Sequence, residues 1–126
     1  MANSQRRSNR KASGGRYVPS RTKKLRELDR LPTHTRLGKR QSKILRVKGA
    51  LKKVITMMDD HVNLMDPKTK KYSKVKIDQV IDNPANRNFV RRNIITKGTI
   101  VKTAKGNAKI VSRPGQEGML NAVLIK

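Results

Sequence analysis

The sequence predicts an all-β protein with a small antiparallel, barrel-like body, one short helix and a long basic N-terminal arm. After Ser42, aliphatic and β-branched residues recur with a period near two between turn residues, which is typical of short half-buried strands. Before Ser42, apolar residues are sparse and unphased. A length of 126 residues suits one small domain with a tail. We therefore expect an arm over residues 1–42 and a body over residues 43–126.

The arm is rich in Arg, Lys, Ser, Asn, Gly and Pro, a composition that buries too little apolar surface to offset the entropy of ordering. Up to Lys48 the chain carries 16 basic residues against Glu27 and Asp29, a net charge of +14, which leaves 16 minus 6, or +10, for the rest. Within the arm, residues 23–31 place Leu25, Leu28 and Leu31 three apart, a spacing that suits one or two helical turns. An isolated helix shorter than about 12 residues is marginal in water, so the arm is expected to have no fold of its own.

The body is expected to contain six or seven short strands. The predicted strands are residues 44–48, 51–58, 62–64, 75–77, 94–103 and 119–125. Asp66, Pro67 and Lys68 predict a turn, and residues 105–107, which read Lys-Gly-Asn, predict the tip of a hairpin.

One helix start interrupts the strands. Asn83 can cap a helix, Pro84 suits its first position, and residues 85–92 extend it to about two turns. The sequence lacks the helical crossovers that a parallel sheet needs, so the strands indicate an antiparallel barrel or sandwich.

Charge indicates the kind of partner. The chain has 32 Lys and Arg against 8 Asp and Glu, a net charge of +24. Such an excess repels itself in a compact state and is tolerated where a polyanion neutralises it. We therefore expect a nucleic acid as the partner, and an arm that is disordered without RNA.

Several classes of protein are excluded. The chain has no Cys, so disulfides, thiolate metal sites and cysteine nucleophiles cannot occur. No run of about 18 apolar residues could span a bilayer, and Arg6 and Arg7 are not followed by the apolar stretch of a secretory signal. We expect a soluble intracellular protein with no membrane contact, no cofactor and no small-molecule substrate.

Two places in the sequence are candidates for catalysis. Asp59, Asp60 and His61 are adjacent, but neighbouring strand positions point to opposite faces, so these side chains are not expected to converge on a metal. A turn or strand end is the preferred interpretation. His34 has no surrounding pattern that marks it as a base, and a phosphate or backbone contact is preferred. We predict no enzymatic activity and no metal site.

Residues 115–118 read Gly-Gln-Glu-Gly, a Gly-x-x-Gly pattern. KH domains clamp nucleotide backbones with such a loop. Those loops lie between helices, whereas here Pro114 precedes the loop and strand-like residues follow it. A tight turn between strands is preferred, with contact between its amides and RNA as the alternative.

Basic residues are the main candidates for phosphate contacts. In the arm they surround Gly14 and Gly15, where the backbone can approach a phosphate closely. On the predicted helix, Arg87 and Arg91 are four apart and share a face. With three aromatic residues in the chain, stacking on single-stranded bases is disfavoured, and phosphate contacts to folded RNA are favoured. The predicted RNA-binding residues are Arg6, Arg7, Arg10, Lys11, Gly14, Gly15, Arg16, Arg21, Lys23, Lys24, His34, Arg36, Lys39, Arg40, Arg87, Arg91, Arg92 and Arg113.

Four separated blocks carry a family resemblance. Residues 10–16 read RKASGGR, residues 32–38 PTHTRLG, residues 82–98 DNPANRNFVRRNIITKG and residues 112–118 SRPGQEG. In this order they resemble the eukaryote-type small-subunit ribosomal protein number eight family, over essentially the whole chain. The short link between the last two blocks is similar to the archaeal form, because eukaryotic relatives carry a long insertion there. One departure occurs at residues 46–51, which read RVKGAL where the family usually has Arg-x-Arg-Gly-Gly-Asn.

The resemblance implies a structural, cytoplasmic component of the small ribosomal subunit. Its expected partners are ribosomal RNA of the small subunit and neighbouring ribosomal proteins, with the arm threaded along the RNA. Two alternatives remain open at this point. One is a ribosome-assembly factor of the same family, and the other is a DNA-compacting architectural protein.

Overall fold

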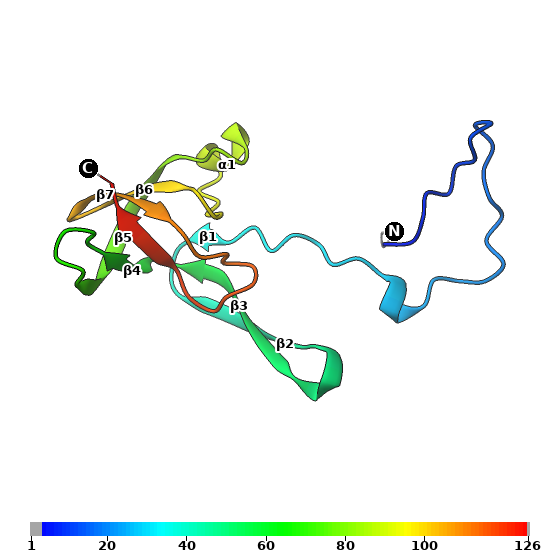
Figure 1. The fold of residues 1–126 in the computed structure, drawn as a ribbon, viewed down its shortest axis with the longest axis horizontal. Helices are drawn as coiled ribbons and strands as arrows, with labels where there is room; N and C mark the ends of the chain where they lie inside the picture. The colour runs from blue at the N-terminus through cyan, green and yellow to red at the C-terminus, as the bar shows by residue number, and fades with distance from the viewer. Residues whose placement is uncertain (1–3, 126) are drawn as a thin grey trace. The chain divides into compact units, whose positions relative to one another are not determined.

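The computed structural model describes residues 4–125 and divides into two compact units, Met1–Pro32 and Thr33–Lys126 (Figure 1). Residues 33–42, which the sequence analysis assigned to the arm, lie in the second unit. The first unit contains one turn of 3-10 helix, η1 (Leu25–Glu27). Its backbone is otherwise joined by isolated bridges that pair Ser4 with Leu28 and Arg10 with Arg16.

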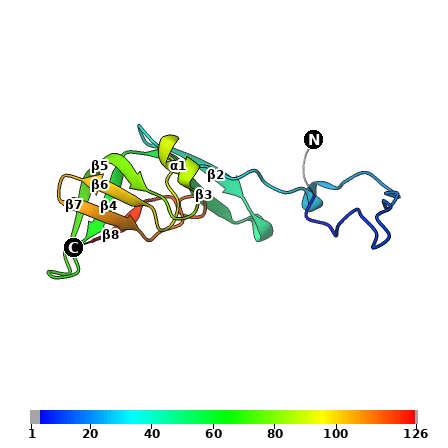
Figure 2. The same cartoon turned by 90° about the horizontal axis from the view of Figure 1, so that it is seen from above.

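The second unit is built mainly from strands. They are β1 (Arg36–Leu37), β2 (Gln41–Arg46), β3 (Lys52–Asp59), β4 (His61–Met65), β5 (Tyr72–Asp82), β6 (Ile100–Thr103), β7 (Gly106–Ile110) and β8 (Asn121–Leu124). One short helix, α1 (Arg87–Arg91), and a 3-10 turn, η2 (Lys48–Ala50), complete the unit. Strands β4 to β8 close a barrel, and β1, β3 and β2 form a three-stranded sheet (Figure 2). The predicted all-β, barrel-like body with one short helix is confirmed. No helix in residues 4–125 has the length and apolar character needed to cross a membrane.

Closure of the barrel depends on one parallel pairing. The pairings of β4 with β5, β5 with β6, β6 with β7 and β7 with β8 are antiparallel. The last pairing joins β4 to β8 in parallel, with Leu64 opposite Ala122. Each of the five strands therefore has two neighbours, and the barrel has no free edge.

The barrel interior is aliphatic. On β4, Val62 and Leu64 point inward, and Val75 and Ile77 on β5 alternate with exposed lysines in the same way. Further inward-facing residues of the cluster are Val80, Ile95, Val101, Ala108, Ile110, Leu120 and Ala122. The alternation read from the sequence therefore identifies the inner face of these strands correctly.

Strands β2 and β3 extend beyond the barrel as a two-stranded ribbon (Figures 1 and 2). At its tip, η2 places Gly49 at φ +72° and Ala50 at φ +60°, and the Val47 amide donates to the Leu51 carbonyl at 2.8 Å. Ala50 occupies the position where the family pattern has its second glycine. Ala50 adopts the left-handed conformation, which costs an alanine about 1 kcal/mol relative to glycine.

The prediction of a strand over residues 94–103 is wrong for its first half, because β6 begins at Ile100. Ile94 and Ile95 are fully buried, but they lie in a loop that turns at Gly98, where φ is +92°. The side chain of Thr99 accepts a hydrogen bond from the backbone of Thr96 and tightens this turn. The apolar pair was read as strand because burial in a loop and burial in a sheet look alike in sequence.

The predicted helix cap is also wrong. Asn86 caps α1 with its side chain, so the helix starts three residues later than expected and has little more than one turn. Asn83 is 2% exposed and holds the loop before the helix. Its Nδ2 donates to the Ile94 carbonyl at 3.1 Å, and its Oδ1 accepts from the Ala85 amide at 3.1 Å and the Thr96 hydroxyl at 3.0 Å. With these bonds made, the Asn83 side chain cannot serve as the cap.

This difference between the two asparagines is testable. We expect Asn83→Ala to destabilise the protein by about 2 to 4 kcal/mol, because it leaves buried partners without hydrogen bonds. Asn86→Ala, the matched control, removes an exposed cap and is expected to cost about 1 kcal/mol. Urea denaturation followed by far-UV circular dichroism measures both. Equal losses of stability in the two variants would contradict the interpretation that the buried hydrogen bonds of Asn83 hold the loop before the helix.

Candidate nucleic-acid interface

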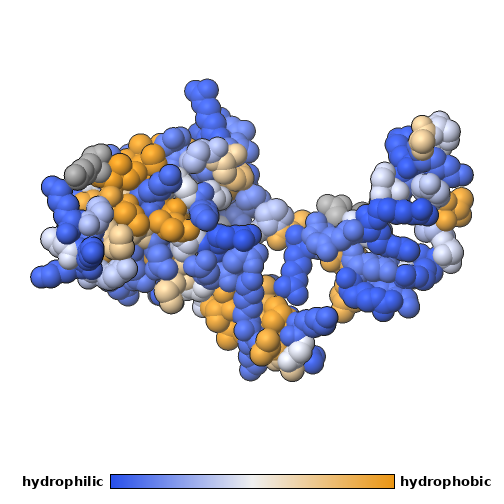
Figure 3. Space-filling view, viewed as in Figure 1, coloured by the Kyte–Doolittle hydropathy of each residue, from blue (hydrophilic) through white to orange (hydrophobic). Residues whose placement is uncertain are grey.

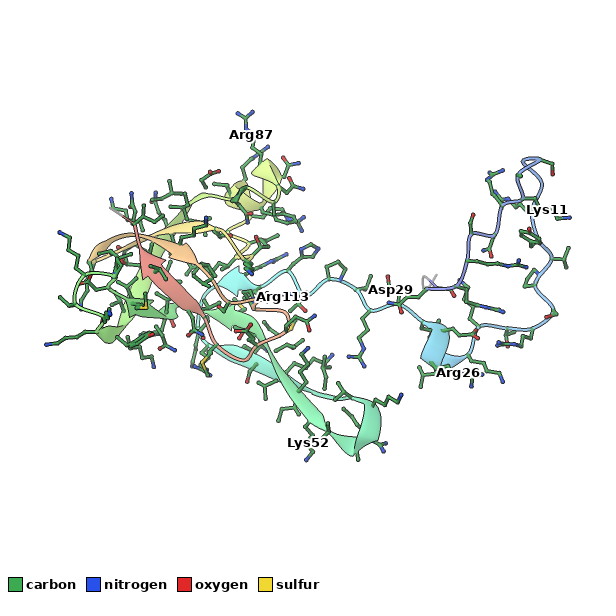
Figure 4. All side chains as sticks on the ribbon, viewed as in Figure 1. Lys11, Arg26, Asp29, Lys52, Arg87 and Arg113 are labelled. Atoms are coloured by element: carbon green, nitrogen blue, oxygen red, sulfur yellow. The ribbon has the colours of Figure 1, made fainter. Side chains whose placement is uncertain are left out.

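In the first unit, a tight loop presents cationic side chains. The Lys11 amide donates to the Gly15 carbonyl at 2.7 Å, and the Gly14 amide donates back to Lys11 at 3.0 Å. The Arg10 guanidinium donates to the Gly14 carbonyl at 3.1 Å. Gly14 has φ +84°, a conformation that glycine adopts without strain. The two glycines thus close the turn on which Arg10 lies against the backbone, and Figure 4 shows Lys11 on the same turn.

Tyr17 gathers cations beside this loop. The Arg7 guanidinium lies 4.2 Å from the centre of its ring, and the Lys11 ammonium lies 5.5 Å from it. Both distances are within the range of cation–π attraction. The ring therefore holds two like charges close together, an arrangement that an anion would stabilise.

The Glu27 carboxylate neutralises part of the positive charge of the first unit through ion pairs with arginines. Both of its carboxylate oxygens accept from the Arg21 guanidinium, at 2.6 and 3.2 Å, and Arg6 lies 3.9 Å away. The hydrogen bonds from Arg21 and from the Lys24 amide lower the pKa of Glu27 from its ordinary value of 4.5 to about 2. Arg21, one of the predicted RNA-binding residues, is thereby oriented by a carboxylate.

The second unit presents a further basic cluster on α1. Arg87 and Arg91 lie on the helix and Arg92 follows it, and all three are exposed. Figure 4 shows Arg87 extending from α1 into solvent. In residues 4–125, no carboxylate forms an ion pair with these three guanidinium groups. Their charge is thus available to an external anion.

The predicted residues between 34 and 40 have different surroundings. His34 packs edge-on against Phe89, with ring centres 5.4 Å apart, while Arg36 and Lys39 are exposed. The Arg40 guanidinium lies 3.7 Å from the buried Asp59 carboxylate and donates to the Gly118 carbonyl at 3.2 Å. Arg40 therefore has a clear structural role within the second unit.

The Gly-x-x-Gly segment is a tight turn between β7 and β8, as the sequence analysis preferred. The Arg113 carbonyl accepts from the amides of Gln116 and Glu117, at 2.8 and 2.9 Å. A Cβ atom on Gly118 would lie 2.9 Å from a methyl group of Val54, so only glycine fits there. Two amides of the loop are thus engaged internally, and the side chains of Arg113, Gln116 and Glu117 are exposed.

The expectation that Asp59, Asp60 and His61 do not converge is wrong. One ligand atom from each lies within 4.8 Å of the others, because Asp60 occupies the bend between β3 and β4. The Asp59 carboxylate accepts from the His61 amide at 3.1 Å, and the His61 Nδ1 lies 2.6 Å from the Asp60 carboxylate. This last hydrogen bond lowers the pKa of Asp60. These hydrogen bonds among the three residues close the bend between β3 and β4.

Sequence reasoning missed the basic residues of the β2–β3 ribbon. They are Lys43, Arg46, Lys48, Lys52 and Lys53. The strands predicted from sequence, residues 44–48 and 51–58, contain four of these five positions, and none of the five is among the predicted RNA-binding residues. The signal that could have found them is the run from residue 30 to residue 58, which contains nine basic residues and no acidic one. Figure 4 shows Lys52 towards the outer end of the ribbon.

Comparison with known proteins decides the family. The model of the family described as Ribosomal protein S8e matches residues 4–125. This chain belongs to the ribosomal protein S8e family. A relative from Methanocorpusculum labreanum named small ribosomal subunit protein eS8 is 51% identical over 120 residues, covering 95% of this chain and 96% of the relative. Proteins of the same name from Methanobrevibacter smithii and Nanoarchaeum equitans are 49% and 48% identical, covering 99% and 95% of this chain and 100% and 94% of those relatives. The family resemblance read from the four blocks, in its archaeal form, is confirmed.

The Glu27 contacts predict a measurable titration. We expect the Glu27 carboxyl to titrate near pH 2 in the intact protein, and its titration in Arg21→Gln to move towards 4.5. A lowered pKa means that the pair stabilises the first unit above pH 4.5 and that this stabilisation is lost as the pH falls through about 2. Carbon-detected NMR of the Glu27 side chain measures both. A titration unchanged by Arg21→Gln would contradict this origin of the shift.

Proposed function

We propose that this chain is a structural component of the small ribosomal subunit and binds its RNA through phosphate contacts. The observation that carries the proposal is the match of nearly the whole chain to S8e relatives named as small ribosomal subunit proteins. The net charge of +24 supports it independently, because a polyanionic partner offsets the repulsion within the chain.

The proposed mechanism is electrostatic. Three regions present cations without a matching number of carboxylates: the first unit, with ten basic and two acidic residues, the β2–β3 ribbon, and α1. Arginine forks in these regions bind phosphates bidentately and release counterions. We propose that the first unit is ordered fully on the RNA, so that its folding is coupled to binding.

The proposed setting is the cytoplasmic ribosome, with ribosomal RNA and neighbouring ribosomal proteins as partners. The chain's role there is to hold RNA segments together, and it catalyses no reaction. The arginines of α1 and the predicted residues of the first unit are the proposed phosphate contacts, together with Arg36, Lys39 and Arg113.

Sedimentation tests the setting. In a high-salt sucrose gradient of cell lysate, we expect the native protein to sediment with mature small subunits. Recovery on precursor particles alone would favour an assembly factor, and recovery with chromosomal DNA would favour a compacting protein. Either result would overturn the ribosomal proposal.

A second experiment tests the mechanism. Replacing Arg87, Arg91 and Arg92 together by Gln is expected to lower the slope of log affinity against log salt concentration by about 2 to 3, since each phosphate contact contributes about 0.7 to 0.9. Filter binding to small-subunit ribosomal RNA measures the slope. The matched control replaces the same three residues by Lys, which retains the charge and is expected to retain the slope. A slope unchanged in the Gln variant would remove α1 from the interface.

A further inference from the structure

The outer face of three neighbouring barrel strands carries an ordered row of apolar side chains. Tyr72 on β5 lies opposite Met65 on β4, and Met65 lies opposite Val123 on β8. Because strand residues alternate between faces, these three side chains share the outer face, while Leu64 and Ala122 point into the core. Figure 3 shows apolar side chains gathered on this part of the barrel, over the strand drawn in red in Figure 1, which is β8.

The adjacent row on the same face is polar. Lys74 on β5 lies opposite Asn63 on β4, and Asn63 lies opposite Asn121 on β8. The Asn63 amide nitrogen donates to the Asn121 side-chain oxygen at 3.1 Å. With this bond made, the Asn63 side chain still offers an oxygen as an acceptor and the Asn121 side chain a nitrogen as a donor. Every nucleobase presents a neighbouring donor and acceptor on its pairing edge, which such a pair can match.

The two rows line a groove of about 520 Å³. This volume lies within the range of about 300 to 1,000 Å³ that is usual for small-ligand sites. Tyr72 is 74% exposed at one end of the apolar row, an unusual exposure for the largest apolar side chain on the barrel. No carboxylate lines the groove.

Lysines border the face on both sides. Lys74 lines the groove, Lys76 is the next outward residue on β5, and Lys109 on β7 lies opposite Val123. The apolar row matches the face of a base, and the amide pair matches the edge of the base. The flanking cations match the phosphates of the nucleotide. A purely apolar protein segment would leave the amide pair without partners.

We propose that the outer face of β5, β4 and β8 binds one unstacked nucleotide of RNA. The base stacks on Tyr72 over Met65 and Val123, its edge meets Asn63 and Asn121, and the lysines contact the flanking phosphates. This inference rests on the proposed function, because it takes RNA as the partner. It adds base recognition to the phosphate contacts, although the sequence analysis set stacking aside on the small number of aromatic residues.

The test measures binding of the full chain to small-subunit ribosomal RNA transcribed in vitro. We expect Tyr72→Ala to weaken binding about 5- to 100-fold, the range for loss of one stacked base, with an unchanged salt slope because no charge is removed. Tyr72→Phe keeps the ring and is expected to bind within about twofold of the unmodified chain. Ultraviolet cross-linking of the complex, followed by mass spectrometry, is expected to join a nucleotide to the peptide that contains Tyr72.

The controls separate the possible failures. Ile81→Ala removes another apolar side chain of β5, one that is 39% exposed and does not line the groove, and it is expected to bind normally. Thermal melting verifies that Tyr72→Ala remains folded. If the unmodified chain fails to bind the RNA, the proposed function fails with the inference. If the unmodified chain binds and Tyr72→Ala binds equally well, the nucleotide site alone is overturned. The same holds if Tyr72→Ala binds free RNA normally but enters small subunits poorly, since the face then serves a protein neighbour.

Discussion

A chain with a net charge of +24 on 126 residues can fold only if its limited apolar material is concentrated in one place. The closed barrel provides that concentration. Its core consists of aliphatic side chains from five strands, and the parallel pairing of β4 with β8 seals the circle. The closure leaves no strand edge of the barrel unpaired, and several outward positions of its strands carry lysines, which are Lys74, Lys76, Lys102 and Lys109.

The remaining elements of the second unit are attached to this barrel through a few polar junctions. Asp59 and the bend at Asp60 join the β2–β3 ribbon to β4, and Arg40 connects that bend to the loop at Gly118. Asn83 performs the same task on the other side, where it ties the segment before α1 to the loop at Ile94. These junctions use buried or partly buried hydrogen bonds because too few apolar residues are left to pack a second core.

Much of the fold could be predicted from sequence because its determinants are local. The alternation of apolar and polar residues identified the inner faces of β4 and β5. The turn residues at positions 105–107 identified the hairpin between β6 and β7. The parallel closure could not be predicted, since it depends on a pairing between residues nearly sixty positions apart. The cap at Asn86 was missed because two asparagines satisfy the same local rule, and only the tertiary contact with Ile94 distinguishes them. For the proposed interface, charge makes the arginines candidates from sequence alone, whereas the row formed by Tyr72, Met65 and Val123 exists only after three strands are aligned.

The short connection between β3 and β4, made by the single residue Asp60, has a mechanical consequence. The six residues of β2, at about 3.3 Å each, make the ribbon roughly 20 Å long, and its partner strand continues almost directly into the barrel wall. A cation at the outer end and a cation on the barrel are thereby kept at a set spacing. If the second unit binds RNA as proposed, it favours those conformations of the RNA in which two distant backbone segments lie at the matching separation. Phosphate contacts along the ribbon require no particular base.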